Sequence, residues 1–185
     1  MKKAVILLLG VIFGLSGCGQ PQDSPALSEN GTWDYKKEAE TTLTYGSGDY
    51  TRINPAMDEH GEINSLIFNG LTAHNGKNEV VPGLAKSWDF DEASCAYTFH
   101  LEEGVKWHDG EPFTAEDVKF TIEAIMDPDN GSENSPNYED VEEIKVIDEH
   151  TIAFRLSAPN VAFLDYMAMA VLPEHLLSGE DMQTS

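Results

Sequence analysis

The sequence predicts a mixed fold of the α+β class, because it combines strand patterns joined by tight turns with separate helical segments. Tyr97, Phe99 and Leu101 alternate with polar residues, which is the period of a half-buried strand. Thr114 stands before a segment with apolar residues at helical spacing and two carboxylates in its first turn. A chain of 185 residues is long enough to enclose a hydrophobic core around such elements.

The N-terminal residues have the pattern of an export signal. Lys2 and Lys3 give a cationic start, and the apolar run at residues 4–14 is too short to span a bilayer as a permanent helix. The next four residues are Leu15, Ser16, Gly17 and Cys18. They resemble the lipobox of bacterial lipoproteins, in which the cysteine thiol takes a diacylglyceryl group and becomes the new N-terminus.

Lipid anchoring is therefore the first functional expectation. We predict a lipoprotein signal peptide at residues 1–17, lipidation of Cys18, and a location at the cell membrane on its extracytoplasmic face, in the periplasm or at the cell exterior. An ordinary signal peptide with an unrelated cysteine is the alternative. Residues 18–40 contain Pro, Ser and Gly without sustained periodicity, which predicts a flexible tether.

The charge of the chain argues against some partners. There are 11 Lys and Arg against 33 Asp and Glu, a formal net charge of −22. Such a surface repels nucleic acid phosphates and anionic lipid headgroups, so we expect no nucleic acid partner and membrane attachment by the lipid anchor only. Solubility explains this charge as well as a preference for cationic ligands does. With Cys18 acylated, Cys95 has no partner, and we predict that it is a buried small side chain rather than a nucleophile.

The folded elements are expected to follow the tether in a regular order. Residues 42–45 form a β-type run, and residues 62–71 carry apolar side chains at helical spacing until a glycine ends the helix. A turn is predicted at residues 80–83 and a short helix at residues 84–88.

The middle of the chain carries the clearest signals. After the strand at residues 97–101, a second strand at residues 105–107 is expected to stop at the turn pair Asp109 and Gly110. Thr114 then caps a helix with a buried apolar face. That face consists of Ala115, Val118, Ile122 and Ile125.

The last third of the chain predicts a hairpin and two further helices. Strands at residues 144–146 and 151–156 are joined by a tight turn, and a helix follows at residues 161–167. The end of the chain gives two overlapping signals, a strand or turn at residues 171–175 and a helix at residues 173–177.

One long segment resembles a known family. Residues 97–120 read YTFHLEEGVKWHDGEPFTAEDVKF, which is similar to the signature region of the bacterial extracellular solute-binding proteins of family 5. These are the oligopeptide, dipeptide and nickel binding components of ABC importers. Supporting segments are NPAMDEHGEINSLIFNGLTAHN, VVPGLAKSWDF, TIAFRLSAPN and FLDYMAMAVLPEH. Many relatives have Arg or Lys where this chain has Glu102, a departure that affects local surface charge.

The resemblance implies a periplasmic-binding-protein-like fold of class II, α+β and α/β, in the type with an extra inserted domain. Family members have two lobes and are considerably longer, so we expect this chain to be the N-terminal part. The expected division is a first strand of lobe I at residues 41–52, an inserted small α+β domain at residues 53–165 and a truncated return to lobe I at residues 166–185.

The implied function is capture of short peptides outside the cell for delivery to an ABC permease with its ATPase. Binding of nickel or a metal chelate for uptake, or peptide sensing without transport, are the alternatives. The resemblance implies no cofactor and no enzyme activity. A secreted hydrolase is the alternative from another class, but the residues alone show no nucleophile elbow, phosphate loop or metal-hydrolase pair.

The family comparison implies ligand contacts after the first strand. These candidates are Gly48, Asp49, Tyr50, Thr51, Arg52, Met57, Asp58 and His60. An extended backbone can pair with a peptide main chain while side chains form pockets, with Asp49 attracting an ammonium group and Arg52 a carboxylate. Alternatively, Asp49 and Arg52 are solvated turn residues and Asp58 caps a helix. The six histidines lack the spacing of a dedicated metal site, so no metal ligand is predicted.

Overall fold

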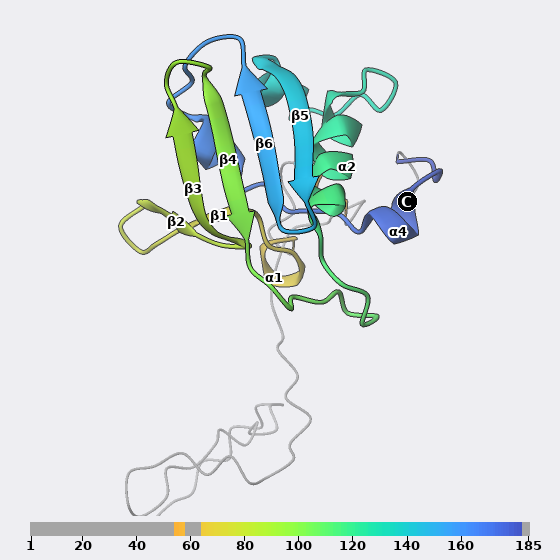
Figure 1. Ribbon diagram of the computed structural model, residues 1–185. Coiled ribbons are helices and arrows are strands. Elements are labelled where there is room, and N and C mark those ends of the chain that lie inside the picture. Colours follow the sequence, from red (N-terminus) through yellow and green to blue (C-terminus); the bar gives the residue numbers. More distant parts are fainter. Residues whose placement is uncertain (1–53, 58–63, 183–185) are drawn as a thin grey trace, which may run out of the picture. The chain divides into compact units, whose positions relative to one another are not determined.

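A four-stranded antiparallel sheet, in the order β3-β4-β6-β5, is the central element of the structure (Figure 1). Its strands are β3 (Ala85–Asp91), β4 (Ala96–Leu101), β5 (Val141–Asp148) and β6 (Thr151–Leu156). This computed structural model describes residues 54–57 and 64–182, all within one compact unit, Gly46–Ser185. The predicted signal peptide, Cys18, the tether and the strand at residues 42–45 lie outside the described residues.

The remaining elements are short, apart from one helix. A two-stranded hairpin is formed by β1 (Thr72–His74) and β2 (Val80–Pro82). The helices are α1 (Asn64–Ile67), α2 (Ala115–Met126), the 3-10 helix η1 (Ser135–Tyr138), α3 (Phe163–Tyr166) and α4 (Glu174–Leu177). No helix in the described ranges has the length and apolar character needed to cross a membrane.

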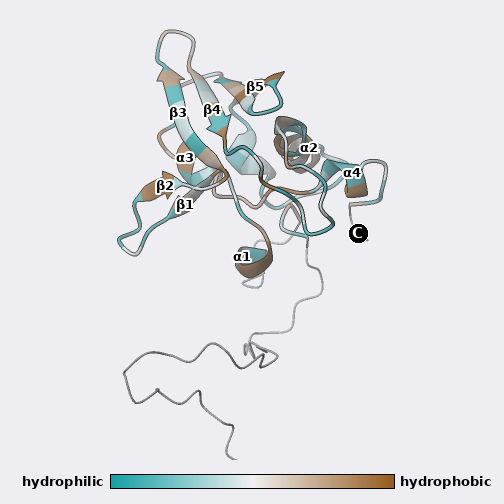
Figure 2. Ribbon diagram, turned by 60° about the horizontal axis from the view of Figure 1, so that its bottom comes forward, coloured by the Kyte–Doolittle hydropathy of each residue, from teal (hydrophilic) through white to brown (hydrophobic). Residues whose placement is uncertain are grey.

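The core lies between the sheet and α2. Strands β4 and β6 bury alternate residues, as the sequence period predicts, and their aromatic rings meet. The Phe99 ring lies 5.9 Å from that of Phe154, which lies 5.7 Å from that of Phe163 in α3. By contrast, β3 is an edge strand with mostly exposed residues, and hydrophilic residues lie along it in Figure 2.

The predicted helix after residue 114 is confirmed with its cap. The Thr114 side chain accepts a hydrogen bond from Glu116 N, and the Asp117 carboxylate accepts one from Thr114 N at 2.8 Å. This capping box satisfies N–H groups that the first turn of a helix leaves unpaired. The predicted apolar face is buried along α2. Three further predictions are confirmed: the strand at residues 97–101, the hairpin of β5 and β6, and the late helices. Of the two overlapping signals near the end of the chain, the helical one is realised, as α4.

Four local predictions are wrong. Residues 85–88 belong to strand β3, and residues 80–82 form strand β2, because each segment pairs with a neighbouring strand that overrides its local preference. Residues 105–107 form no ladder and have only an isolated bridge from Lys106 to Pro112. The predicted helix at residues 62–71 ends at Ile67, since Leu71 O accepts hydrogen bonds from Gly83 N and Ala85 N instead of from a following turn of helix.

Cys95 is half-buried rather than buried, and the reason is its backbone. Its φ of 50° places it in the left-handed region, at the turn between β3 and β4. The turn orients the side chain partly outward, while Cys95 O accepts a hydrogen bond from Leu156 N.

Residues 69–72 form the crossing point of three chain segments. Gly70 O accepts a hydrogen bond from Leu84 N at 2.9 Å, and Thr72 N donates to Met167 O at 3.1 Å. On the same side, Val171 N donates to Asn69 O at 3.0 Å. The crossing is so close that a Cβ atom on Gly70 would lie 2.5 Å from backbone atoms of Ala168. Only glycine fits between these backbones.

A second tie joins α2 to the segment before α4. The buried Asp117 carboxylate accepts a hydrogen bond from Glu174 N at 2.9 Å, besides the one from Thr114. One turn further on, the Thr121 hydroxyl accepts from Leu172 N at 2.8 Å and donates to Asp117 O. Residues 166–182 are therefore held in the same compact unit as the sheet.

Candidate functional site

The structure describes one part of the predicted ligand segment, the turn at residues 54–57. Met57 N donates to Asn54 O at 3.0 Å, and the Asn54 side chain accepts a hydrogen bond from Ala56 N. The same side chain donates to Met182 O at 3.4 Å, across 128 residues of sequence. The turn thus brings the beginning and the end of the described chain together.

Met57 is the predicted ligand residue that the structure describes. Only 5% of its surface is exposed, and it belongs to the hydrophobic core. Next to it, Ala56 O accepts a short hydrogen bond from the Ser132 hydroxyl. The surroundings of Met57 are thus those of a packed turn. The other predicted contacts, which are Gly48, Asp49, Tyr50, Thr51, Arg52, Asp58 and His60, lie outside the described residues and stay predictions.

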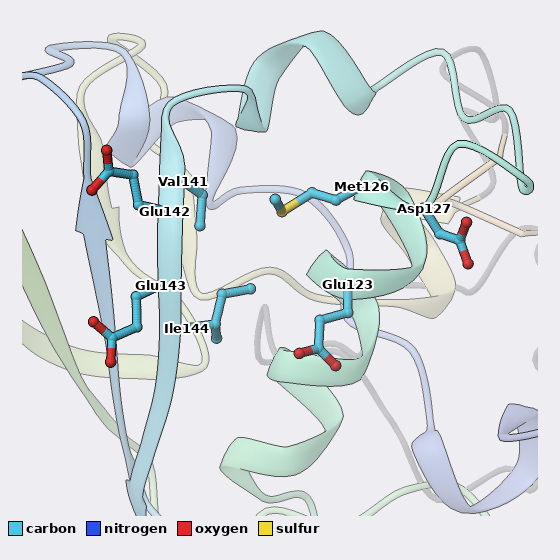
Figure 3. Close-up of a pocket in the computed structure, with 7 residues that line it drawn as sticks. All are labelled: Glu123, Met126, Asp127, Val141, Glu142, Glu143 and Ile144. Atoms are coloured by element: carbon cyan, nitrogen blue, oxygen red, sulfur yellow. The ribbon is translucent and has the colours of Figure 1, made fainter.

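One hollow in the described part of the chain has a volume of about 330 Å³ and lies between α2 and β5 (Figure 3). Four carboxylates border it, but they do not converge. Figure 3 shows that Glu142 and Glu143 point to the other side of β5, where both pair with Arg155, and that Asp127 points away from the helix. Glu123 is the carboxylate turned toward the hollow, beside apolar side chains. This geometry does not concentrate negative charge as a cation site would.

The second hollow is small and mostly apolar. Its volume is about 70 Å³. The lining residues are Ile67, Phe68, Asn69, Leu84, Val105, Lys106, Trp107, His108, Phe113 and Val171. It is too small to enclose a peptide.

Three histidines lie within hydrogen-bonding distance of aspartates. His74 Nε2 lies 2.9 Å from Asp165 Oδ1, His100 Nε2 lies 2.9 Å from Asp89 Oδ2, and His175 Nε2 lies 2.7 Å from Asp109 Oδ2. Each pair connects two different elements. Among the described residues, no group of three His, Cys, Asp or Glu side chains is arranged to hold a metal ion.

The pair of His175 and Asp109 has the clearest electrostatic effect. Its hydrogen bond raises the pKa of His175 and lowers that of Asp109, because each group stabilises the charged form of the other. The sequence placed His108 in the turn with Asp109, but His108 is exposed and the partner of Asp109 comes from 66 residues away. No local pattern marks this pairing.

Comparison with known proteins identifies the class of protein to which this fold belongs. The model of the bacterial extracellular solute-binding proteins, family 5 Middle, matches residues 79–180, more than half of the chain. The chain belongs to this family, as the sequence analysis anticipated. Its members are binding proteins that act outside the cytoplasm.

Curated relatives include two peptide-binding proteins. The Di/tripeptide-binding protein 1 of Pseudomonas aeruginosa is 36% identical over 121 residues, which cover 56% of this chain and 22% of the relative. The Dipeptide-binding protein of Escherichia coli is 32% identical over 154 residues, covering 71% of this chain and 29% of the relative. The chain thus spans less than a third of the length of these relatives.

Solved structures share the fold, which confirms a periplasmic-binding-protein type. NikZ from Campylobacter jejuni, in complex with Ni(L-His), matches with a TM-score of 0.72 and 39% identity, covering 75% of this chain and 28% of that chain. The oligopeptide-binding protein AppA from Bacillus subtilis, in complex with a nonapeptide, matches with a TM-score of 0.66 and 27% identity, covering 73% and 28%.

Proposed function

We propose that this chain is part of the substrate-binding component of an ABC importer that captures short peptides and delivers them to a membrane permease driven by an ATPase. The observation that carries the proposal is the family match across residues 79–180, together with curated relatives that are named as peptide-binding proteins. The chain makes or breaks no bond in this role. Affinity would come from closure of two lobes on the ligand, since a ligand that bridges both favours the closed state.

Nickel or a metal chelate is the second candidate ligand. It is supported by NikZ, whose structure contains Ni(L-His) and which has the higher identity of the two solved structures compared above. Within the described residues no metal-binding group is formed, so on this proposal the ligands to nickel would come from elsewhere in the protein.

A chimera tests the transport role. Residues 54–182 would replace the matching segment of the E. coli Dipeptide-binding protein, since the Asn54 to Met182 contact joins the two ends of the insert. We expect a strain that depends on this chimera to take up dipeptides. Loss of uptake by a chimera that is folded and exported would contradict the role.

Calorimetry then distinguishes the ligand classes. The complete protein that contains this chain would be titrated with a dipeptide, with a nonapeptide and with nickel in the presence of L-histidine. Saturable heat with a peptide alone supports the proposal, and saturable heat with nickel and histidine alone supports the second candidate.

The lipid anchor is also a proposal, and one substitution tests it. Cys18→Ser removes the thiol that would carry the diacylglyceryl group, so we expect the protein to move from the membrane fraction to the soluble fraction. The measurement is fractionation followed by immunoblotting, with Cys95→Ser as the matched control that stays with the membrane. An unchanged membrane fraction for Cys18→Ser would contradict anchoring through Cys18, and an ordinary cleaved signal peptide would leave both the unsubstituted protein and Cys18→Ser in the soluble fraction.

A further inference from the structure

The segment before α2 folds back on itself as a hairpin, residues 105–113. Phe113 N donates to Val105 O at 3.0 Å, and Trp107 N donates to Glu111 O at 2.8 Å. The tip is closed by Gly110 N, which donates to Trp107 O, at a φ of 98° that favours glycine. Phe113 is buried, and Val105 and Trp107 are partly buried against the core, whereas the tip at residues 108–110 is exposed.

The tip of the hairpin contacts α4. His175 Nε2 lies 2.7 Å from Asp109 Oδ2, and the His175 ring lies 6.4 Å from the Trp107 ring. The start of α4 is in turn bonded to α2, through Glu174 N and the Asp117 carboxylate. The pair of His175 and Asp109 therefore closes a ring of contacts between the hairpin, α2 and α4.

Among the described residues, the charged groups with the largest effect on the His175 imidazole are acidic. They are Asp109 and Glu111 from the hairpin and Asp117 from α2. The protonated imidazole is favoured in this setting because it faces carboxylates from both elements packed against it. The neutral imidazole keeps a hydrogen bond to Asp109 but loses the ionic part of the attraction.

We propose that the pair of His175 and Asp109 is a pH-sensitive latch, which holds the tip of hairpin 105–113 against α4 when His175 is protonated and releases it when His175 is neutral. The latch is a conformational device of the fold and does not depend on which ligand the protein carries. It applies to a protein that works outside the cytoplasm, where pH is set by the medium.

The pH range of the latch follows from the two pKa shifts. His175 has a raised pKa, so its contribution is fully present below its ordinary value of 6.5 and is lost as pH rises through the higher folded-state value. Asp109 has a lowered pKa, so its contribution is present above its ordinary value of 3.8 and is lost as pH falls through the lower folded-state value. Both contributions are complete between pH 3.8 and 6.5.

Hydrogen exchange measured by mass spectrometry on the full chain tests the latch. After correction for intrinsic exchange rates, we expect protection of the amides in residues 105–113 to fall roughly two- to fivefold from about pH 5.5 to about pH 8.5. In His175→Gln, whose amide can bond Asp109 but never becomes charged, we expect no such change. Asp109→Asn should also abolish it.

His100→Gln is the matched control, because its pair with Asp89 joins β3 and β4 rather than the hairpin. It should keep the wild-type pH dependence of the hairpin. A second measurement is the fluorescence of Trp107 in a Trp33→Phe, Trp88→Phe background, which reports the titration of the nearby imidazole. Hairpin protection that is independent of pH, or that changes equally in His175→Gln, would overturn the proposal, even if the imidazole itself titrates.

Discussion

Gly70→Ala is expected to lower the free energy of unfolding by about 3 kcal/mol. The added Cβ would lie 2.5 Å from the carbonyl carbon and oxygen of Ala168, and these are backbone atoms that no rotamer change can move away. Relief would require the crossing segments to separate, which would weaken the hydrogen bond from Leu84 N to Gly70 O. Urea unfolding followed by circular dichroism measures the effect.

Gly76→Ala is the matched control for this substitution. A Cβ on Gly76 meets no heavy atom within 4 Å, and its backbone is not in the left-handed region. We expect it to change the stability by less than about 0.5 kcal/mol. Equal stabilities for the two alanine variants would mean that the crossing of residues 69–72 is looser than described.

The second large effect is expected for Asp117→Ala. This substitution removes the buried carboxylate that accepts hydrogen bonds from Thr114 N and Glu174 N, so that both N–H groups lose this acceptor. Because hydrogen bonds to a charged group contribute more than neutral ones, we expect a loss of about 3 kcal/mol. Thermal unfolding measures the loss, and hydrogen exchange should show the segment at residues 172–177 opening first.

Glu116→Ala provides the comparison. Glu116 is in the same first turn of α2 but is exposed, so it contributes mainly through the helix dipole. Its loss should cost less than about 1 kcal/mol. If Asp117→Ala cost no more than Glu116→Ala, then the tie between α2 and α4 would not contribute to stability.

Local signals predicted the elements that local interactions stabilise. Helix α2 was predictable because Thr114, its acidic first turn and its apolar face all lie within one segment. Strand β3 was not predictable from local signals, because residues 84–88 lack an alternating pattern. Residues 85–88 become extended by pairing with residues of β4 that lie at least 11 positions later in the chain, as Trp88 pairs with Phe99. The fold class and family depended on longer segments and are confirmed.

The candidate site was less accessible to sequence reasoning, for a related reason. Asp109 and His175 are brought together by the packing of α4, and no sequence motif at either position predicts their contact. The resemblance to the family implies Met57 as a ligand contact, and the structure places Met57 in the core. All the predicted ligand contacts, Met57 included, remain predictions, as does the division of the chain into domains.

The contact of Asn54 with Met182 has a mechanical consequence. Because the bond joins residues that are 128 positions apart, the first described turn and the last described residue lie side by side. A force that separates these two positions would therefore act first on this contact, before it reaches the strands of the sheet.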